Sequence, residues 1–178
     1  MNKEIKLLGK EIKNGKIAVI PTDTIYGIVC SAFNKKSVER LYEIRKRNLK
    51  KPMIILISSI KDLSLFSVKI DKKITNKYWP GKVSIIVSVE RFDYLHRGKK
   101  SLAFRLPKNR SLIEFLKVSG PLVAPSANIE GGKPAKTIEE AKKYFTDKID
   151  FYLDRGTLKG EPSKIISLEK GEVEVVRK

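Results

Sequence analysis

The feature that most constrains the fold is a series of short apolar runs separated by amphipathic stretches. The runs IAVI (17–20), MIILIS (53–58), VSIIVSV (83–89) and PLVA (121–124) are typical of buried strands. None approaches the roughly 20 apolar residues that are needed to cross a bilayer, so we expect no membrane association. At 178 residues the chain is long enough for one domain with its own core, and we expect a single domain over 1–178.

The spacing of apolar residues predicts helices between these runs. Candidate helices cover 3–14, 61–79, 109–118 and 137–145, and a further helix begins after Asn34. SLAFRLP, IDFYL, KIISL and EVEVV are read as further strands, and RFDYLHRGKK as a surface hairpin or loop. Some strands are neighbours in sequence, so we expect an α+β (mixed α/β) domain. It would have a twisted mixed sheet with helices packed on its faces, rather than a strict βαβ series.

Two polar segments follow buried-strand runs and open with proline, which tends to end a strand. They are PTDTIYG (21–27) and PSAN (125–128). Ligands collect at such strand ends in sheets flanked by helices. Between them lies RKRNLKK (45–51), which has five cationic side chains. Hydroxyls together with this cation cluster predict a concave pocket for a phosphorylated ligand.

Individual side chains support this prediction. Arg45 continues the apolar stripe of the helix through Leu41, so it either snorkels or reaches a ligand. Ser126 and Asn128 alternate along a stretch read as extended, which would point both side chains the same way, although an Asx turn explains them equally. Arg105 lies among apolar residues with few carboxylates nearby, so a ligand carboxylate or phosphate is its expected partner.

Several chemistries have little support. The only histidine, His96, lies in a polar, basic stretch and gives weak support for a catalytic triad. The only cysteine, Cys30, excludes an internal disulfide, suits a reducing cytoplasm and is read as a small buried hydrophobe. There is no GxGxxG segment after a strand and no Walker loop. Any phosphates must therefore be held by side-chain cations and hydroxyls.

The charge is strongly positive, with 38 Lys and Arg against 20 Asp and Glu, a net +18. This excess indicates either a nucleic acid or another polyanion as partner, or a solvated surface. The lysines are spread along the chain, and both interpretations stay open at this point.

Taken together, the motifs resemble those of the YrdC-domain family, the L-threonylcarbamoyladenylate synthases. PTDTIYG is similar to the family's PTxTxYG, RKRNLKKPM to its KxRPxxxPL, and WPGKVSIIV to its WPGPxT. AFRLP resembles VRxP, and APSAN with GGKP resembles SAN-x-SG-x-P. PSKIISL is similar to the late STI strand, and VEVVRK to the terminal arginine segment. These matches run in order, nearly from end to end.

The resemblance implies a YrdC-like fold and a nucleotidyltransferase. Such an enzyme condenses L-threonine, bicarbonate and ATP, with Mg²⁺, to threonylcarbamoyl-AMP and pyrophosphate. A partner complex then transfers the threonylcarbamoyl group to tRNA. No enzyme nucleophile is needed, which fits the residues present. Two rivals are another carbamoyl adenylate former and a non-catalytic RNA-binding module; the interleaved aromatics of a stacking platform are missing.

The resemblance also assigns roles to residues. Threonine would be bound by Thr24, Arg105, Ala124 and Ser163, and ATP by Arg47, Lys51, Ser101, Ser126, Asn128 and Arg177, with Arg45 as an additional basic clamp and no metal ligand from protein side chains. The chain departs from the family pattern at Arg45 (family lysine), Asn48 (proline), Ser84 (threonine) and Leu56 (histidine in some relatives). RNA binding is expected only as a weak, salt-labile background, and Lys99, Lys100, Lys142 and Lys143 are expected to be dispensable for synthesis.

Overall fold

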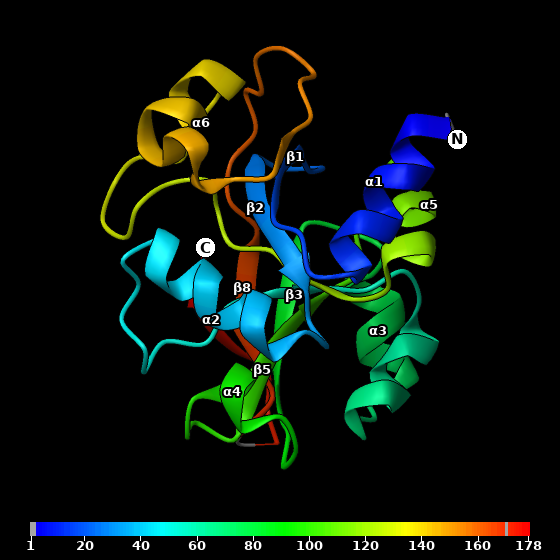
Figure 1. The fold of residues 1–178 in the computed structure, drawn as a ribbon. Helices are drawn as coiled ribbons and strands as arrows, with labels where there is room; N and C mark the ends of the chain where they lie inside the picture. Colours follow the sequence, from blue (N-terminus) through cyan, green and yellow to red (C-terminus); the bar gives the residue numbers. More distant parts are fainter. Residues whose placement is uncertain (1–2, 170) are drawn as a thin grey trace.

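A single mixed β-sheet runs through the computed structural model, which describes residues 3–169 and 171–178 (Figure 1). The α-helices are α1 Lys3–Lys13, α2 Lys35–Ile44, α3 Lys72–Tyr78, α4 Asp93–His96, α5 Arg110–Ser119 and α6 Ile138–Phe145, and the 3₁₀ helices are η1 Ile60–Phe66 and η2 Thr146–Lys148. The strands are β1 Ala18–Pro21, β2 Tyr26–Ser31, β3 Ile55–Leu56, β4 Val83–Ser88, β5 Ser101–Arg105, β6 Leu122–Val123, β7 Phe151–Tyr152, β8 Lys164–Ser167 and β9 Glu174–Arg177.

The order of the strands across the sheet is β7-β1-β2-β6-β3-β5-β4-β8-β9. Three of the pairings, β1 with β7, β3 with β5 and β4 with β8, are parallel, and the others are antiparallel. This mixture confirms the predicted fold class. It also brings the two proline-led segments close together, because β2, which continues from the first segment, pairs with β6, which precedes the second, and Gly27 bridges to Ser126.

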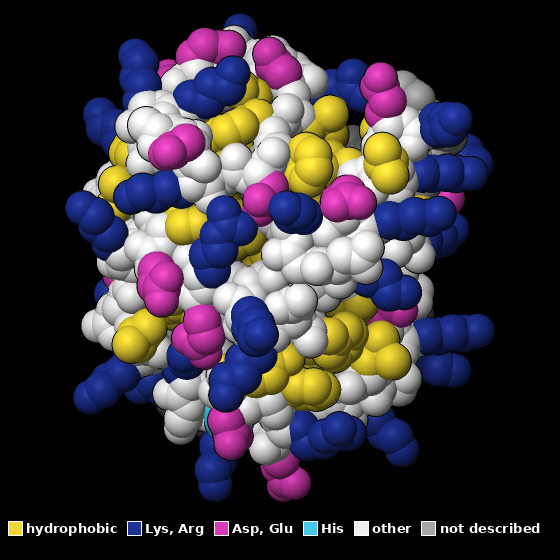
Figure 2. All heavy atoms as spheres, viewed as in Figure 1, with side chains coloured by type: hydrophobic (Ala, Val, Ile, Leu, Met, Phe, Trp, Pro, Cys, Tyr) yellow, Lys and Arg dark blue, Asp and Glu magenta, His cyan; other side chains and the backbone are white. Residues whose placement is uncertain are grey.

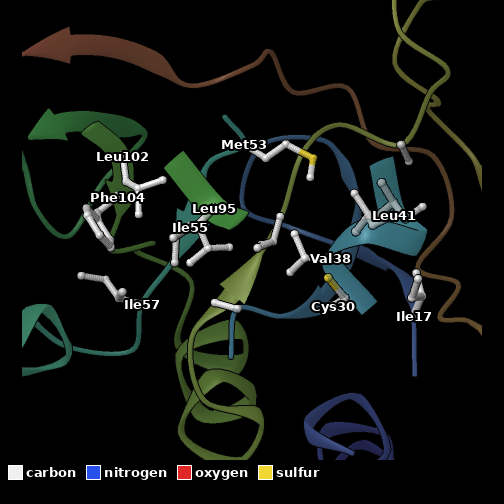
Figure 3. Packing of buried hydrophobic residues seen from close by; sticks show 14 of the residues in the cluster. Ile17, Cys30, Val38, Leu41, Met53, Ile55, Ile57, Leu95, Leu102 and Phe104 are labelled. Atoms are coloured by element: carbon white, nitrogen blue, oxygen red, sulfur yellow. The ribbon is translucent and has the colours of Figure 1, made fainter. Parts of the chain in front are cut away.

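Both faces of the first half of the sheet are buried. Along the β1 segment, Ile17 and Val19 join a large apolar cluster with α2, α4 and α6, whereas Ala18 and Ile20 join a smaller cluster with α1 and α5. The alternation follows from the two-residue period of a strand. Figure 3 shows part of the larger cluster, with Cys30 beside Val38. Cys30 is fully buried, as predicted, and burial raises the pKa of its thiol.

The second half of the sheet is covered on one face only. On β5, Leu102 and Phe104 point into the large cluster, and the alternate residues Ser101, Ala103 and Arg105 line pockets. The register pairs Leu56 of the small cluster with Arg105, so the pockets lie on the same face as α1 and α5. In Figure 1 these two helices lie side by side at the β1–β2 end. The functional site therefore occupies the part of this face that α1 and α5 leave open.

Two local predictions were wrong, and one strand was missed. The segment 61–79 is not one helix: η1 ends at Ser67, which has a left-handed φ of 58°, and α3 begins anew with Asp71 as its N-cap. The stretch 91–100 is not a surface hairpin, because α4 buries Leu95 and His96 against the sheet. The fully buried strand β2 was not anticipated, since its first residues belong to the PTDTIYG motif that had been read as polar.

The helix starts agree better with the local sequence, because N-cap residues mark them. Asn34, Asn109 and Thr137 each accept a hydrogen bond from the backbone N–H three residues later. Such caps satisfy one of the unpaired N–H groups at a helix start and are worth about 1 kcal/mol each. The predicted helix starts after Asn34 and at 137 are confirmed, with Asn34 and Thr137 as the N-caps.

Candidate active site

Two adjoining pockets lie on the open part of the sheet face. The first, the basic pocket, has a volume of about 360 Å³, and its lining includes the four cationic residues Arg45, Arg47, Lys99 and Arg177. The second, the hydroxyl pocket, has a volume of about 190 Å³ and is lined by Thr22, Thr24, Tyr26, Arg105, Ser163 and neighbours. Ile54, Pro125, Ser126 and Arg177 line both pockets, so ligands in the two would meet there.

The residues assigned by resemblance divide between the two pockets. Those assigned to threonine all line the hydroxyl pocket: Thr24, Arg105, Ala124 and Ser163. Of those assigned to ATP, the basic pocket is lined by Arg47, Ser101, Ser126 and Arg177, together with Arg45. Asn128 lies in the hydroxyl pocket instead, and Lys51 is not among the residues that line either.

Arg45 is the most buried cation of the basic pocket, with only 2% of its surface exposed. Its Nε donates to the Asn128 carbonyl at 3.0 Å, and its Nη2 lies 3.5 Å from Asn128 Oδ1. Nη1 is buried and has no hydrogen-bond partner among the described residues. Burial, and then the charge of Arg47, lower the pKa of Arg45 to about 10, so the group is still charged near neutral pH. A buried charge with a free donor is a strong attractor for an anion.

Arg47 is held by its own loop. Its Nε donates to the Lys51 carbonyl and its Nη2 to the Pro52 carbonyl, both at 3.0 Å. These bonds fix the plane of the guanidinium. Its Nη1 lies 3.9 Å from the carboxylate of Glu130. The arginine is thus oriented before any ligand arrives, which reduces the entropy cost of binding.

Arg105 has a protein partner that the sequence analysis missed. Its Nη1 lies 3.1 Å from Asp23 Oδ1 and donates to Thr24 Oγ1 at 3.2 Å. Asp23 comes from the β1–β2 turn of the same PTDTIYG motif, and the tertiary fold brings it to β5. The expectation of few nearby carboxylates was therefore wrong. Burial lowers the pKa of Arg105, and the negative charge of Asp23 partly counters this effect.

The Arg105 guanidinium still has an unused edge. Its Nε is buried without a hydrogen-bond partner among the described residues. The Nε edge of an arginine can grip a carboxylate with two parallel hydrogen bonds. Because Arg105 lines the hydroxyl pocket, this edge is suited to a small ligand that carries a carboxylate.

Ser163 connects the hydroxyl pocket to Arg177. Arg177 donates to the Ser163 carbonyl through Nε at 3.0 Å and Nη2 at 2.6 Å. The Ser163 hydroxyl shares a hydrogen bond of 2.9 Å with Ser84 from β4. Ser84, which stands where the family has threonine, therefore supports the pocket through its hydroxyl.

Asn128 holds its loop rather than facing the basic pocket. Its Nδ2 donates to the carbonyls of Ile129 at 2.7 Å and Gly132 at 2.9 Å. Its N–H donates to the Ser126 carbonyl at 3.0 Å, an i to i+2 bond that turns the chain. The chain therefore turns between Ser126 and Asn128, which is the alternative to the extended stretch, and both residues line the hydroxyl pocket.

A close backbone approach completes the hydroxyl pocket. A Cβ placed on Gly160 would overlap the Thr24 carbonyl oxygen, so only glycine fits there. The loop that leads to Pro162 and Ser163 can therefore lie directly on Thr24. Gly160 was not singled out from the sequence, since nothing local marks a contact across about 136 residues.

Two other residues missed from the sequence are Lys99 and Glu169, which line the basic pocket. The prediction that Lys99 lies on the surface outside the site is wrong. Lys99 follows α4, whose presence was not predicted, and it lies beside the start of β5.

The Sua5/YciO/YrdC family model, described as "Telomere recombination", matches residues 10–178. The chain belongs to the Sua5/YciO/YrdC family. A Methanocaldococcus jannaschii relative, provisionally named a threonylcarbamoyl-AMP synthase, is 34% identical over 98% of this chain and 85% of its own length. The threonylcarbamoyl-AMP synthase of Marinobacter nauticus is 25% identical over 95% of this chain and 93% of its own length.

The solved structures agree on the fold. Pyrococcus abyssi Sua5 in complex with L-threonine has a TM-score of 0.86 and is 27% identical, covering 93% of this chain and 51% of that one. A variant of the same Sua5 gives a TM-score of 0.91 at 26% identity, over 98% of this chain and 56% of that one. This member of the family therefore spans about half the length of that Sua5.

The rest of the surface shows no single basic face in the view of Figure 2. Lysine and arginine side chains project around the whole outline and alternate with Asp and Glu. None of the helices in the described ranges is long and apolar enough to cross a membrane. The distribution of charge in this view fits a solvated surface better than a defined polyanion track.

Proposed function

We propose that this chain is a threonylcarbamoyl-AMP synthase that joins L-threonine, bicarbonate and ATP and releases pyrophosphate. The observation that carries the proposal is the contact between the two pockets at Ser126 and Arg177. A cation-lined pocket beside a small pocket with a buried arginine suits a nucleotide beside an amino acid. The names of the relatives agree with this function.

In this proposal the hydroxyl pocket takes threonine. The carboxylate binds the Nε edge of Arg105, and Thr24 and Ser163 present hydroxyls to the amino acid. The threonine complex of the Pyrococcus relative supports this substrate. The threonine amine would then point toward Ser126 and the basic pocket, where the phosphates lie.

The basic pocket takes the triphosphate. Threonine amine and bicarbonate combine to a carbamate with loss of water. A carbamate oxygen then attacks the α-phosphorus while the bond to the β-phosphate oxygen breaks and pyrophosphate leaves. The side chains Arg45, Arg47 and Arg177 stabilise the charge that builds up on the phosphate oxygens. Positioning and charge stabilisation suffice, so the reaction requires no protein nucleophile.

Mg²⁺ is expected to accompany ATP. Among the described residues no three His, Cys, Asp or Glu side chains come together in a way that could hold a metal ion. We propose that the ion enters with the nucleotide, bound by triphosphate oxygens, where it neutralises phosphate charge. The product adenylate would pass to a separate complex that modifies tRNA.

The test is ATP-dependent pyrophosphate release with a panel of amino acids and with or without bicarbonate. The proposal requires release that depends on threonine and bicarbonate together, and identification of the adenylate by mass spectrometry. Release with another amino acid but not threonine would contradict it. Tight RNA binding that survives moderate salt, without any synthesis, would favour an RNA-binding module.

A further inference from the structure

Two segments about eighty residues apart in the sequence are joined by polar contacts beside the basic pocket. One is the basic loop, residues 45–51, and the other is the asparagine loop, residues 125–132. The Arg45 guanidinium joins the two loops by its contacts with Asn128. Glu130 supplies the others, and neither pocket lining includes it.

Glu130 uses both its backbone and its carboxylate. Its N–H donates to the Arg45 carbonyl at 3.0 Å. Its Oε2 accepts from the Asn48 backbone N–H at 2.6 Å, and its Oε1 accepts from Lys51 Nζ at 3.0 Å. The residue therefore fixes the start, the middle and the end of the basic loop.

The contacts of Glu130 with Asn48 and Lys51 enclose a turn on which the orientation of Arg47 depends. Within this turn the Lys51 N–H donates to the Asn48 carbonyl at 3.1 Å. Arg47 in turn places its Nε and Nη2 on the carbonyls of Lys51 and Pro52. If the turn moves, these carbonyls move, and the Arg47 guanidinium loses its orientation toward the basic pocket.

The Glu130 carboxylate also offsets positive charge in the basic loop. The basic loop concentrates five cations that repel one another, and the Glu130 carboxylate lies 3.0 Å from Lys51 Nζ and 3.9 Å from Arg47 Nη1. The Asn48 N–H bond, and then the Lys51 ammonium, lower the pKa of Glu130, so it is ionised near neutral pH. Its side chain is 25% exposed, which leaves it accessible to water but partly enclosed by the loop.

We propose that Glu130 is a positioning residue for nucleotide binding, which holds the turn 48–51 so that Arg47 faces the basic pocket in a fixed orientation. The proposal rests on the proposed function only in naming ATP as the ligand. It assigns no contact between Glu130 and the nucleotide. Its effect is transmitted through Asn48, Lys51 and the carbonyls that Arg47 binds.

The test compares Glu130→Ala, Glu130→Gln and the control Glu43→Ala in the full chain. Glu43 is an exposed glutamate near the end of α2, and only its backbone carbonyl bonds to the basic loop, so removal of its side chain changes net charge equally and keeps those bonds. ATP affinity is measured by calorimetry without threonine, and threonine affinity separately. We expect Glu130→Ala to weaken ATP binding about tenfold, since it removes contacts to charged groups, and to leave threonine binding unchanged.

Glu130→Gln should retain part of the affinity, because its amide oxygen can still accept from Asn48. In turnover, KM for ATP should rise with kcat nearly constant. Equal or tighter ATP binding by Glu130→Ala would overturn the inference, because the carboxylate would then compete with phosphate for Lys51. Absence of ATP binding by the unmodified protein would overturn the proposed function as well, which separates the two failures.

Discussion

Arg105 and Asp23 form an ion pair of 3.1 Å in which their side chains are only 5% and 7% exposed. The two residues come from β5 and from the β1–β2 turn, 82 positions apart. Burial of two charges costs desolvation free energy, which their mutual attraction offsets when the geometry is good. Asp23 therefore keeps the arginine charged and ordered before a ligand arrives, while the Nε edge stays open.

Replacing Arg105 by lysine should abolish high-affinity threonine binding. Lysine keeps the charge but cannot offer two parallel donors, and it cannot reach Asp23 and a ligand in the same geometry. Loss of a charge-assisted bond of about 1.5–3 kcal/mol corresponds to an affinity loss of roughly ten- to 150-fold. Calorimetric titration with threonine measures this loss of affinity, and the exposed Arg110→Lys is the control. Unchanged affinity would place the threonine carboxylate elsewhere.

Arg47→Ala should weaken ATP binding by a similar factor with little effect on folding. The side chain is 19% exposed, and its hydrogen bonds are to its own loop rather than to the core. Nucleotide affinity and thermal unfolding should be measured on the same preparation. A large fall in melting temperature with normal ATP affinity of the folded fraction would show that Arg47 is a structural residue.

Gly160→Ala should impair threonine binding more than ATP binding. The added methyl group would overlap the Thr24 carbonyl and push away the loop that carries Ser163. Overpacking of this kind lowers the free energy of unfolding by about 1–3 kcal/mol. Here it would also displace residues that line the hydroxyl pocket. Affinities for both ligands give the measurement, and the neighbouring exposed Lys159→Ala is the matched control. Equal losses for both ligands would indicate general destabilisation instead.

Asp150→Asn should lower stability at neutral pH but not in acid. Burial raises the pKa of Asp150, but the Ile17 N–H bond of 2.8 Å and the Arg40 bond of 2.7 Å outweigh it and leave the pKa lowered. A lowered carboxylate pKa stabilises the fold above the unfolded value of about 4, and this contribution is lost as the pH falls through the folded pKa.

Urea unfolding at pH 7 should therefore show a deficit of about 1–2 kcal/mol for Asp150→Asn relative to the unmodified protein. The two curves should converge only as the pH falls below the folded-state pKa of Asp150, which lies under the unfolded value of about 4, because the Asp150 side chain is uncharged in both states only there. A deficit that stays constant between pH 7 and pH 3 would assign the effect to packing rather than to charge.

The lysines outside the two pockets should be dispensable for adenylate synthesis. Neutralising Lys100, Lys142 and Lys143 to glutamine should leave adenylate synthesis nearly unchanged, because none of them lines a pocket. Lys99→Gln should raise KM for ATP, since this residue lines the basic pocket. RNA retention by filter binding should be weak and lost with a few-fold rise in salt. Collapse of synthesis in the triple variant would give the surface charge a specific role.

Much of the molecule could be predicted from local sequence. The period of the apolar residues located most helices and strands, and Asn34 and Thr137 marked helix starts correctly. The ordered motifs indicated the family. The helix predicted over 61–79 failed because a stretch with one apolar stripe can break at a left-handed residue such as Ser67 without changing its pattern.

What the sequence determined by itself was therefore the fold class, the family and the residue types of the site, since these depend on periodicity and on contiguous motifs. Only the tertiary structure decided the pairing of Arg105 with Asp23, the clamp of Glu130 on the basic loop and the approach of Gly160 to Thr24. Each joins segments that are tens of residues apart. Such contacts are set by the order and register of strands across the whole sheet, which no local pattern of side chains encodes.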